Sequence, residues 1–77
     1  MDHQYLVLIH RAEEGGYWAE VPSLEGCFAQ GKTIEELLQD ARGASASHLE
    51  ALREDGRPAP QEQVIIATVQ AEEPLSA

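Results

Sequence analysis

The sequence has a single cysteine and no long hydrophobic run. Cys27 is the only cysteine among the 77 residues, so no disulfide can form within the chain. A lone cysteine also fits a reducing compartment. The apolar run at residues 6–9 is much too short to cross a bilayer, and the amino terminus lacks the basic, apolar and cleavage regions of a signal peptide. These absences predict a cytoplasmic protein that spans no membrane.

Basic side chains are also scarce. Five Lys and Arg residues stand against fourteen Asp and Glu residues, which gives a net charge of −9. Because nucleic-acid binding depends on Lys and Arg neutralising phosphates, we expect no direct binding to nucleic acid. An acidic surface favours a basic protein as partner. The alternative is that the charge only keeps the protein soluble.

The chain is long enough for one domain only. Residues 1–70 are predicted to form it, and residues 71–77 a flexible tail. A chain of this size buries only about 60% of the surface that its unfolded form exposes, and small domains often gain stability from a disulfide, a metal or a partner subunit. The three histidines are scattered and lack the spacing of a zinc site. We therefore expect a homo-oligomer, a dimer or higher.

Four short apolar segments predict β-strands. The first, YLVLI, is apolar on both faces, which is typical of a central, doubly covered strand. AEEGG supplies a turn after it, and Pro22 and Gly26 bracket a second turn. The strands are expected at residues 5–9, 17–21, 27–30 and 63–69.

One helix is predicted between the third and fourth strands. Thr33 and Glu36 form a T-x-x-E capping box that starts it. Gly56, followed by two prolines, predicts its end. An apolar stripe at helical spacing is expected to lie on the sheet and consists of Ile34, Leu37, Leu38, Ala41, Ser45, Leu49 and Leu52.

These elements predict an α+β fold of two layers in the order β-β-β-α-β. The segment from the third strand through the helix to the fourth is long enough for a right-handed crossover. The fourth strand would then lie beside the first and parallel to it. The expected sheet order is 3-2-1-4, with the helix packed on one face.

Two surfaces are candidates for contact with other proteins. The face of the helix opposite the stripe carries like charges at helical spacing, which any solvated face tolerates but which a basic partner could also bind. We define this acidic ridge as Glu36, Asp40, Glu50 and Glu54. Because one helix covers only one face of a sheet, the other face is the predicted self-association surface. Its candidate residues are Leu6, Leu8, Trp18 and Phe28.

No pattern for catalysis, metal binding or a cofactor is present in the sequence. Cys27 has no histidine near it and is separated from the helix by a strand segment, so a core position is favoured over a nucleophile. There is no G-x-S-x-G elbow and no glycine-rich phosphate loop. The first strand also lacks the acid with which metal-dependent nucleases of the ribonuclease-H-like fold hold their ions. A vestigial hydrolase that uses Cys27 is the enzyme alternative.

The segment GGYWAEVPSLEGCFAQGKTIEELLQDA, at residues 15–41, resembles the signature of the HicB-type antitoxin domain. DGRPAP, at residues 55–60, resembles the exit from the helix in the same family, and the likeness extends from about residue 3 to residue 70. The motif residues are expected to be scaffold residues, namely Pro22, Gly26, Cys27, Gly31, Thr33 and Glu36.

This resemblance implies a partial ribonuclease-H-like fold without nuclease activity. It also implies a partner, because members of the family bind and neutralise a small basic HicA-type toxin that cleaves messenger RNA. Many members carry a carboxy-terminal DNA-binding domain, and we see no such segment here, so the chain resembles a stand-alone version for which transcriptional repression is in doubt. The alternative is a stand-alone oligomeric regulatory or structural domain with no toxin partner.

Overall fold

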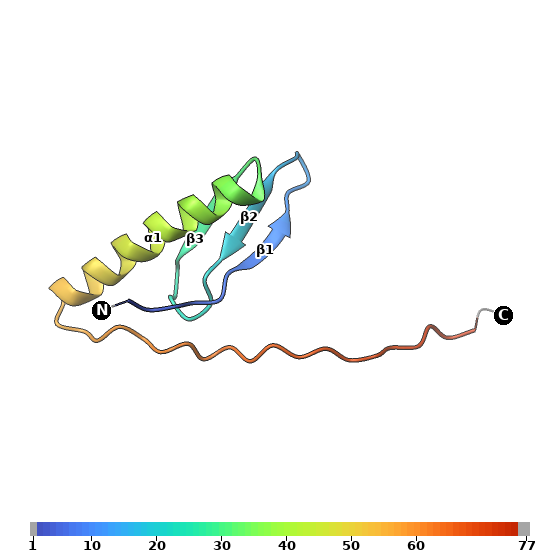
Figure 1. The fold of residues 1–77 in the computed structure, drawn as a ribbon. Coiled ribbons are helices and arrows are strands. Elements are labelled where there is room, and N and C mark those ends of the chain that lie inside the picture. Colours follow the sequence, from blue (N-terminus) through green and yellow to red (C-terminus); the bar gives the residue numbers. More distant parts are fainter. Residues whose placement is uncertain (1, 76–77) are drawn as a thin grey trace.

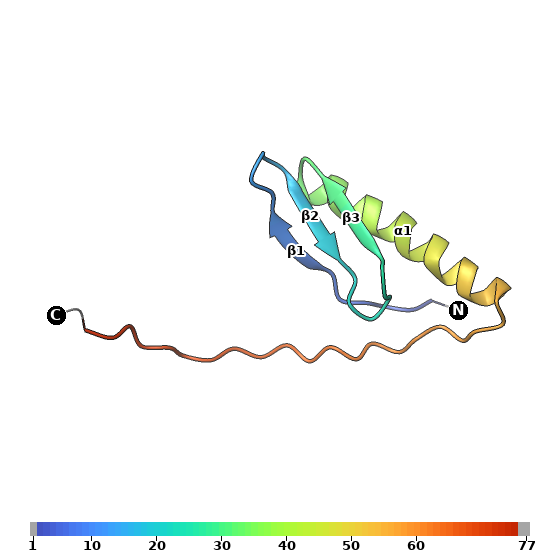
Figure 2. The same cartoon turned by 180° about the vertical axis from the view of Figure 1, so that it is seen from behind.

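Two layers form the body of the computed structural model, which describes residues 2–75: a three-stranded antiparallel sheet and one helix on one of its faces (Figure 1). The strands lie in the order β1-β2-β3. Figure 2 shows the sheet from the side that the helix leaves open. The elements are β1 (Leu8–Arg11), β2 (Tyr17–Glu20), β3 (Phe28–Gly31) and α1 (Ile34–Glu54).

Two turns set the register of the sheet. In the first, the N–H of Ala12 donates to the carbonyl of Gly16 at 3.0 Å, which places Arg11 opposite Tyr17. In the second, the N–H of Val21 donates to the carbonyl of Cys27 at 3.0 Å. The register puts Ala19 between Ile9 and Ala29 on the helix side of the sheet.

The helix begins and ends as the sequence predicts. The Thr33 hydroxyl accepts the N–H of Glu36 at 3.1 Å, while the Glu36 carboxylate accepts the N–H of Lys32 at 3.0 Å. The carboxylate thus reaches the residue before the cap, not the cap itself. At the other end Gly56 has φ of +72°, and the N–H of Arg57 donates to Leu52 at 2.9 Å. This is a Schellman motif, which satisfies carbonyls that the helix leaves free.

The core lies between α1 and the two strands β2 and β3. Leu24, from the second turn, and Leu37, from α1, are completely buried. Cys27 is also buried, and its Sγ lies 3.8 Å from the Ser45 hydroxyl of α1. The buried hydrophobic residues are Ala19, Val21, Leu24, Cys27, Ala29, Leu37 and Ala41.

Gly31 is the point at which the sheet and the helix come closest. A Cβ atom at this position would lie 2.4 Å from the backbone nitrogen of Leu37 and 2.8 Å from its Cα. Both are backbone atoms and cannot move aside cheaply. Only glycine therefore lets the end of β3 pack against the first turn of α1.

The predicted position of the first strand is wrong in part. Pairing starts at Leu8 and continues to Arg11, whereas the sequence predicted residues 5–9. The reason is that the facing strand ends early: Glu20 is the last residue of β2, and Pro22 after it has no N–H to donate. The N–H of Leu6 instead donates to the side chain of Glu62.

The prediction of a fourth strand in the chain's own sheet is also wrong. Residues 60–75 are extended but form no strand pairing within the described part of the chain. Consequently β1 is an edge strand, not the central strand of a 3-2-1-4 sheet. The predicted tail at residues 71–77 is exposed as far as residue 75, and residues 76–77 lie outside the described range.

Candidate functional site

All four residues of the acidic ridge are exposed on α1. Two of them also contact the neighbouring strand, because Asp40 accepts the N–H of Gln30 at 2.9 Å and Glu36 accepts that of Lys32 at 3.0 Å. Near the other end of the helix, Glu50 lies 3.5 Å from the guanidinium of Arg53. The amino-terminal half of the ridge is therefore partly structural, and its carboxyl-terminal half is free of backbone contacts.

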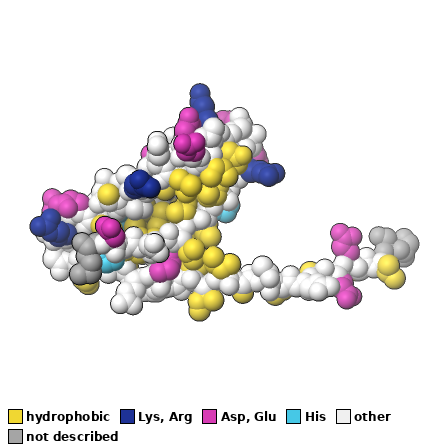
Figure 3. Space-filling view, in the orientation of Figure 1, with side chains coloured by type: hydrophobic (Ala, Val, Ile, Leu, Met, Phe, Trp, Pro, Cys, Tyr) yellow, Lys and Arg dark blue, Asp and Glu magenta, His cyan; other side chains and the backbone are white. Residues whose placement is uncertain are grey.

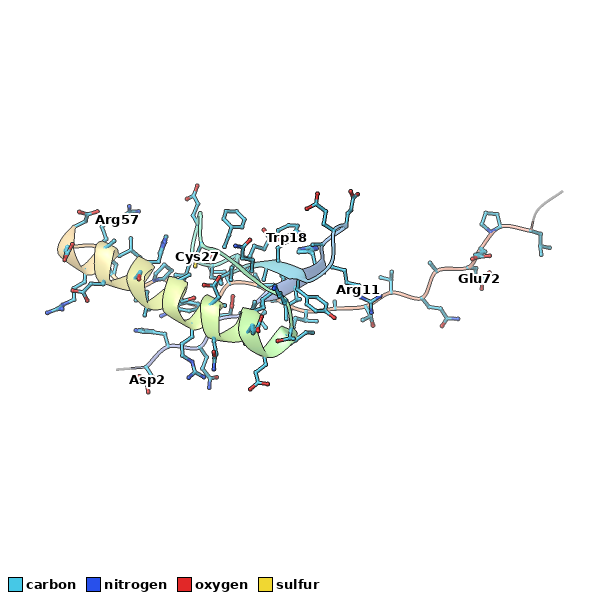
Figure 4. All side chains as sticks on the ribbon, turned by 90° about the horizontal axis from the view of Figure 1, so that it is seen from above. Asp2, Arg11, Trp18, Cys27, Arg57 and Glu72 are labelled. Carbon is cyan, nitrogen blue, oxygen red and sulfur yellow. The ribbon has the colours of Figure 1, made fainter. Side chains whose placement is uncertain are left out.

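The outer sheet face, defined as the face turned away from α1, carries the larger exposed apolar side chains. Leu8 lies opposite Glu20, and Glu20 lies opposite Phe28, so the side chains of Leu8 and Phe28 are on this face. Trp18 is on it as well, and Figure 4 shows it on the side of the sheet away from the helix. Leu6 precedes the paired part of the strand and is half-buried. The structure thus brings together three of the four predicted self-association residues.

A histidine and an acid complete the outer face. The ring of His10 stacks on Trp18 with centroids 4.2 Å apart and an interplanar angle of 16°. The Nε2 atom of His10 lies 3.6 Å from a carboxylate oxygen of Glu20. The exposed tryptophan fits a protein-contact surface, because aromatic residues are enriched at such surfaces.

The outer face and the ridge meet at one end of the molecule. A shallow hollow of about 1150 Å³ is lined by Trp18 from β2, by Gln30 and Lys32 at the end of β3, and by Glu36 and Asp40 from α1. Its full lining holds four carboxylates, from Glu13, Glu14, Glu36 and Asp40, against the two cationic side chains of Arg11 and Lys32, beside the rings of Tyr17 and Trp18. Such a combination suits a cationic side chain of a partner protein.

Nothing in the arrangement around Cys27 resembles a reaction centre. The thiol is buried beside the Ser45 hydroxyl, as a core residue would be. Between residues 2 and 75 there is no group of three or more His, Cys, Asp and Glu side chains that could hold a metal ion. No helix within the same range is long and apolar enough to cross a membrane.

Glu62 is a structural residue that the sequence did not reveal. Its carboxylate accepts the N–H of Leu6, the hydroxyl of Ser23 and, at 3.1 Å, the N–H of Val64. These donors lower the pKa of Glu62 from 4.5 to about 2, with the N–H of Leu6 as the largest cause. Tyr5 adds a second contact by donating its hydroxyl to the carbonyl of Pro60 at 2.6 Å. No periodicity or motif points to such contacts between distant segments.

Comparison with known proteins gives consistent matches. A family model, the HicB_like antitoxin of bacterial toxin-antitoxin systems, matches residues 5–75. A UPF0150 protein of Synechocystis sp. is 38% identical over 83% of this chain and 81% of its own length. A UPF0150 protein of Thermoplasma acidophilum is 37% identical over 88% of this chain and 99% of its own length.

A solved structure matches as well. One chain in the structure of a HicA3 and HicB3 toxin-antitoxin complex is 36% identical, with a TM-score of 0.61 over 73% of the present chain. The match spans 64% of the length of that solved chain. The α+β arrangement of a three-stranded sheet and one helix is therefore shared with a protein solved in a toxin-antitoxin complex.

Proposed function

Because the chain belongs to the HicB-like antitoxin family of bacterial toxin-antitoxin systems, we propose that it binds and neutralises a small basic toxin of the HicA type. The observation that carries this proposal is the likeness to a chain solved in a HicA3 and HicB3 complex, at 36% identity and a TM-score of 0.61. The net charge of −9 supports it, since an acidic protein attracts a basic one and competes with its RNA substrate. We place both partners in the cytoplasm.

The acidic ridge is the surface that we propose for the toxin. Glu50 and Glu54 are exposed, and the ion pair of Glu50 with Arg53 is itself solvent-exposed, so their carboxylates are accessible to a partner. Glu36 and Asp40 bring the same charge to the hollow beside Trp18. A basic toxin could thus contact carboxylates along the helix and place one cationic side chain near an aromatic ring.

Self-association is the second part of the proposal. The exposed apolar side chains of Leu8, Trp18 and Phe28 lie together on the outer sheet face, where a second copy could cover them. The partial ribonuclease-H-like likeness stays a prediction. So does the division into a domain at residues 1–70 and a tail.

The function proposed is binding and not catalysis. The burial of Cys27 supports this, since a reactive thiol needs access and a lowered pKa. The hydrolase alternative predicts that Cys27→Ser abolishes a measurable turnover. A variant that folds normally while no activity is found before or after the change would argue against that alternative.

A co-expression experiment tests the proposal. The small basic protein encoded beside this gene is expressed alone and together with the chain. We expect growth arrest and loss of messenger RNA in the first case, with rescue in the second and co-purification of the two proteins at low salt. A neighbour that is not rescued and does not bind at low salt would favour the stand-alone oligomeric domain.

A further inference from the structure

The C-terminal segment, defined as residues 63–69, leaves the body of the protein in an extended form (Figures 1 and 2). Its side chains include Ile65 at 90%, Ile66 at 70% and Val69 at 90% exposure. The N–H groups of Gln63 and Val64 are bonded to Ser23 and Glu62, but the exposed apolar side chains that follow gain nothing from burial, so an extended run of this kind is unfavourable in water. Within the described residues, the segment is a strand without a sheet.

The dimensions of the molecule also show that part of the chain is not packed against the body. The radius of gyration is 16.1 Å, whereas a compact chain of this length has about 11–12 Å. The accessible surface is 6804 Å², compared with about 4600 Å² for a compact protein of this mass. The excess is roughly 2200 Å² in each copy, or about 4400 Å² for two copies, which is the range of total area that obligate homodimer interfaces bury.

The sheet has one free edge and one edge that is partly blocked. On β3, the N–H of Gln30 is taken by Asp40 of α1, and Glu36 takes the N–H of Lys32 just beyond the strand. On β1, pairing occurs on one side only, with β2. An exposed edge without such protection is a template for pairing with another strand. β1 is therefore where an additional strand can join.

The core is also open beside β1. Ile9 points to the helix side, in register with Ala19, yet Ile9 is 37% exposed and Ala19 is fully buried. The helix packs over β3 and β2 rather than β1, and Leu38 on its near side is 46% exposed. A groove of about 880 Å³ runs between the helix and residues 2–7. Figure 3 shows hydrophobic side chains gathered on the face of the body that this view presents, with the extended C-terminal residues running out beyond the body.

The chain's own segment is directed away from this groove. Glu62 fixes its start, because the carboxylate is held by Leu6 and Ser23 and the N–H of Gln63 donates to the Ser23 hydroxyl at 3.0 Å. Residues 57 and 59 each precede a proline, and a residue before proline favours an extended backbone. The chain between the helix and Glu62 is therefore expected to be extended. After residue 64 the segment continues straight, past the end of the body (Figure 1). An extended segment of seven residues spans about 23 Å, more than the four-residue strand β1 requires.

We propose that two copies of this chain exchange their C-terminal segments. Residues 63–69 of each copy pair with the β1 edge of the other, and their apolar side chains cover the groove beside Ile9 and Leu38. The exchange is reciprocal, so it closes as a symmetric dimer. The 3-2-1-4 sheet is then completed by a strand from the partner. This inference goes beyond toxin binding and uses a surface distinct from the outer sheet face.

Mixed isotope labelling of the full chain tests the exchange directly. Chains labelled with ¹⁵N and chains labelled with ¹³C are unfolded together and refolded, and NOEs between differently labelled copies are recorded. We expect contacts between the amides of β1 and residues 63–69 of the other copy. A monomer at every concentration, contacts only within one copy, or a dimer without contacts to β1 would each overturn the proposal.

A pair of variants separates this interface from others. Ile66→Lys alters a side chain that is exposed in the single chain, so the body should fold, while the dimer dissociation constant should rise about 10- to 100-fold. Leu75→Lys introduces the same change of charge beyond the segment, and it should leave the dimer dissociation constant within about threefold of the wild-type value. Equal effects of Ile66→Lys and Leu75→Lys would contradict the exchange.

The salt dependence of dimerisation is an independent test of the exchange. Two copies of charge −9 repel each other, so salt should strengthen the dimer or leave it unchanged. Binding to a basic toxin should weaken with salt. A dimer that dissociates as salt is added would contradict the apolar exchange, without bearing on toxin binding.

Discussion

The carboxylate of Glu62 accepts the backbone N–H of Leu6, a residue 56 positions earlier in the chain. This contact joins the segment after the helix to the segment before the first strand. It decides where the C-terminal segment leaves the body, and with the Ser23 hydroxyl it holds the second turn in the same cluster. Glu62 is thus the centre of the contacts that position the exposed segment, together with the bonds from Tyr5 to Pro60 and from Gln63 to Ser23.

The first prediction concerns the pH dependence of this anchor. The folded-state pKa of Glu62 is lowered from 4.5 to about 2, so the ionised carboxylate contributes stability that is fully present above pH 4.5 and is lost as the pH falls toward 2. Glu62→Gln removes that contribution. Thermal unfolding at fixed protein concentration should show the largest difference between the two proteins above pH 4.5 and a shrinking difference below it. A difference that stays constant down to pH 2 would contradict the anchor.

The second prediction compares two glycines. Gly31→Ala places a Cβ atom 2.4 Å from a backbone nitrogen of Leu37, so we expect a loss of about 1–3 kcal/mol in the free energy of unfolding. Gly43→Ala lies within α1, where a Cβ atom meets nothing within 4 Å, and should gain about 0.5–1 kcal/mol. Urea unfolding of both variants measures the difference. Two shifts of the same sign would show that the contact at Gly31 is misplaced.

The third prediction tests the core. Leu37 is completely buried against the sheet, so Leu37→Ala should lower the free energy of unfolding by about 2–5 kcal/mol. Leu75 is 99% exposed, and Leu75→Ala should change it by less than about 0.5 kcal/mol. Chemical denaturation followed by Trp18 fluorescence reports both. A small effect at Leu37 would place the core elsewhere.

The helix could be predicted in detail, because its signals are local. The capping box at Thr33 and the glycine at Gly56 act within a few residues, and the structure confirms α1 at Ile34–Glu54. The predicted apolar stripe is right only in part, because Leu37 and Ala41 are buried whereas Ile34 and Leu38 are nearly half exposed. Trp18, a candidate for the uncovered face of the sheet, lies on the outer sheet face and is 41% exposed. Membership in the HicB-like antitoxin family was identified correctly from the motif at residues 15–41.

The sheet edges could not be predicted, because they depend on contacts between distant segments. The apolar residues 5–9 indicated a central strand, but the facing strand ends at Glu20 and the N–H of Leu6 is taken by Glu62. Residues 63–69 have a strand-like composition, yet composition does not say which sheet a strand joins. The contact of Gly31 with Leu37 was missed for the same reason.

The acidic ridge can be tested against matched charge changes. Glu50→Gln with Glu54→Gln removes two charges from the ridge, and Glu72→Gln with Glu73→Gln removes two from the extended C-terminal residues. The first double variant should bind the toxin about 3- to 10-fold more weakly than the wild type, and the second should bind almost as the wild type does. Equal losses in both would show that net charge, not the ridge, determines affinity.

The most direct test is a titration of the purified chain with the basic protein encoded beside its gene, by calorimetry at 50 mM and 300 mM salt together with an RNA-cleavage assay. The proposed function predicts a saturable complex at low salt, an affinity that falls as salt rises, and cleavage that stops when the complex is saturated. Absence of binding at 50 mM salt, or a complex in which the toxin still cleaves RNA, would contradict it.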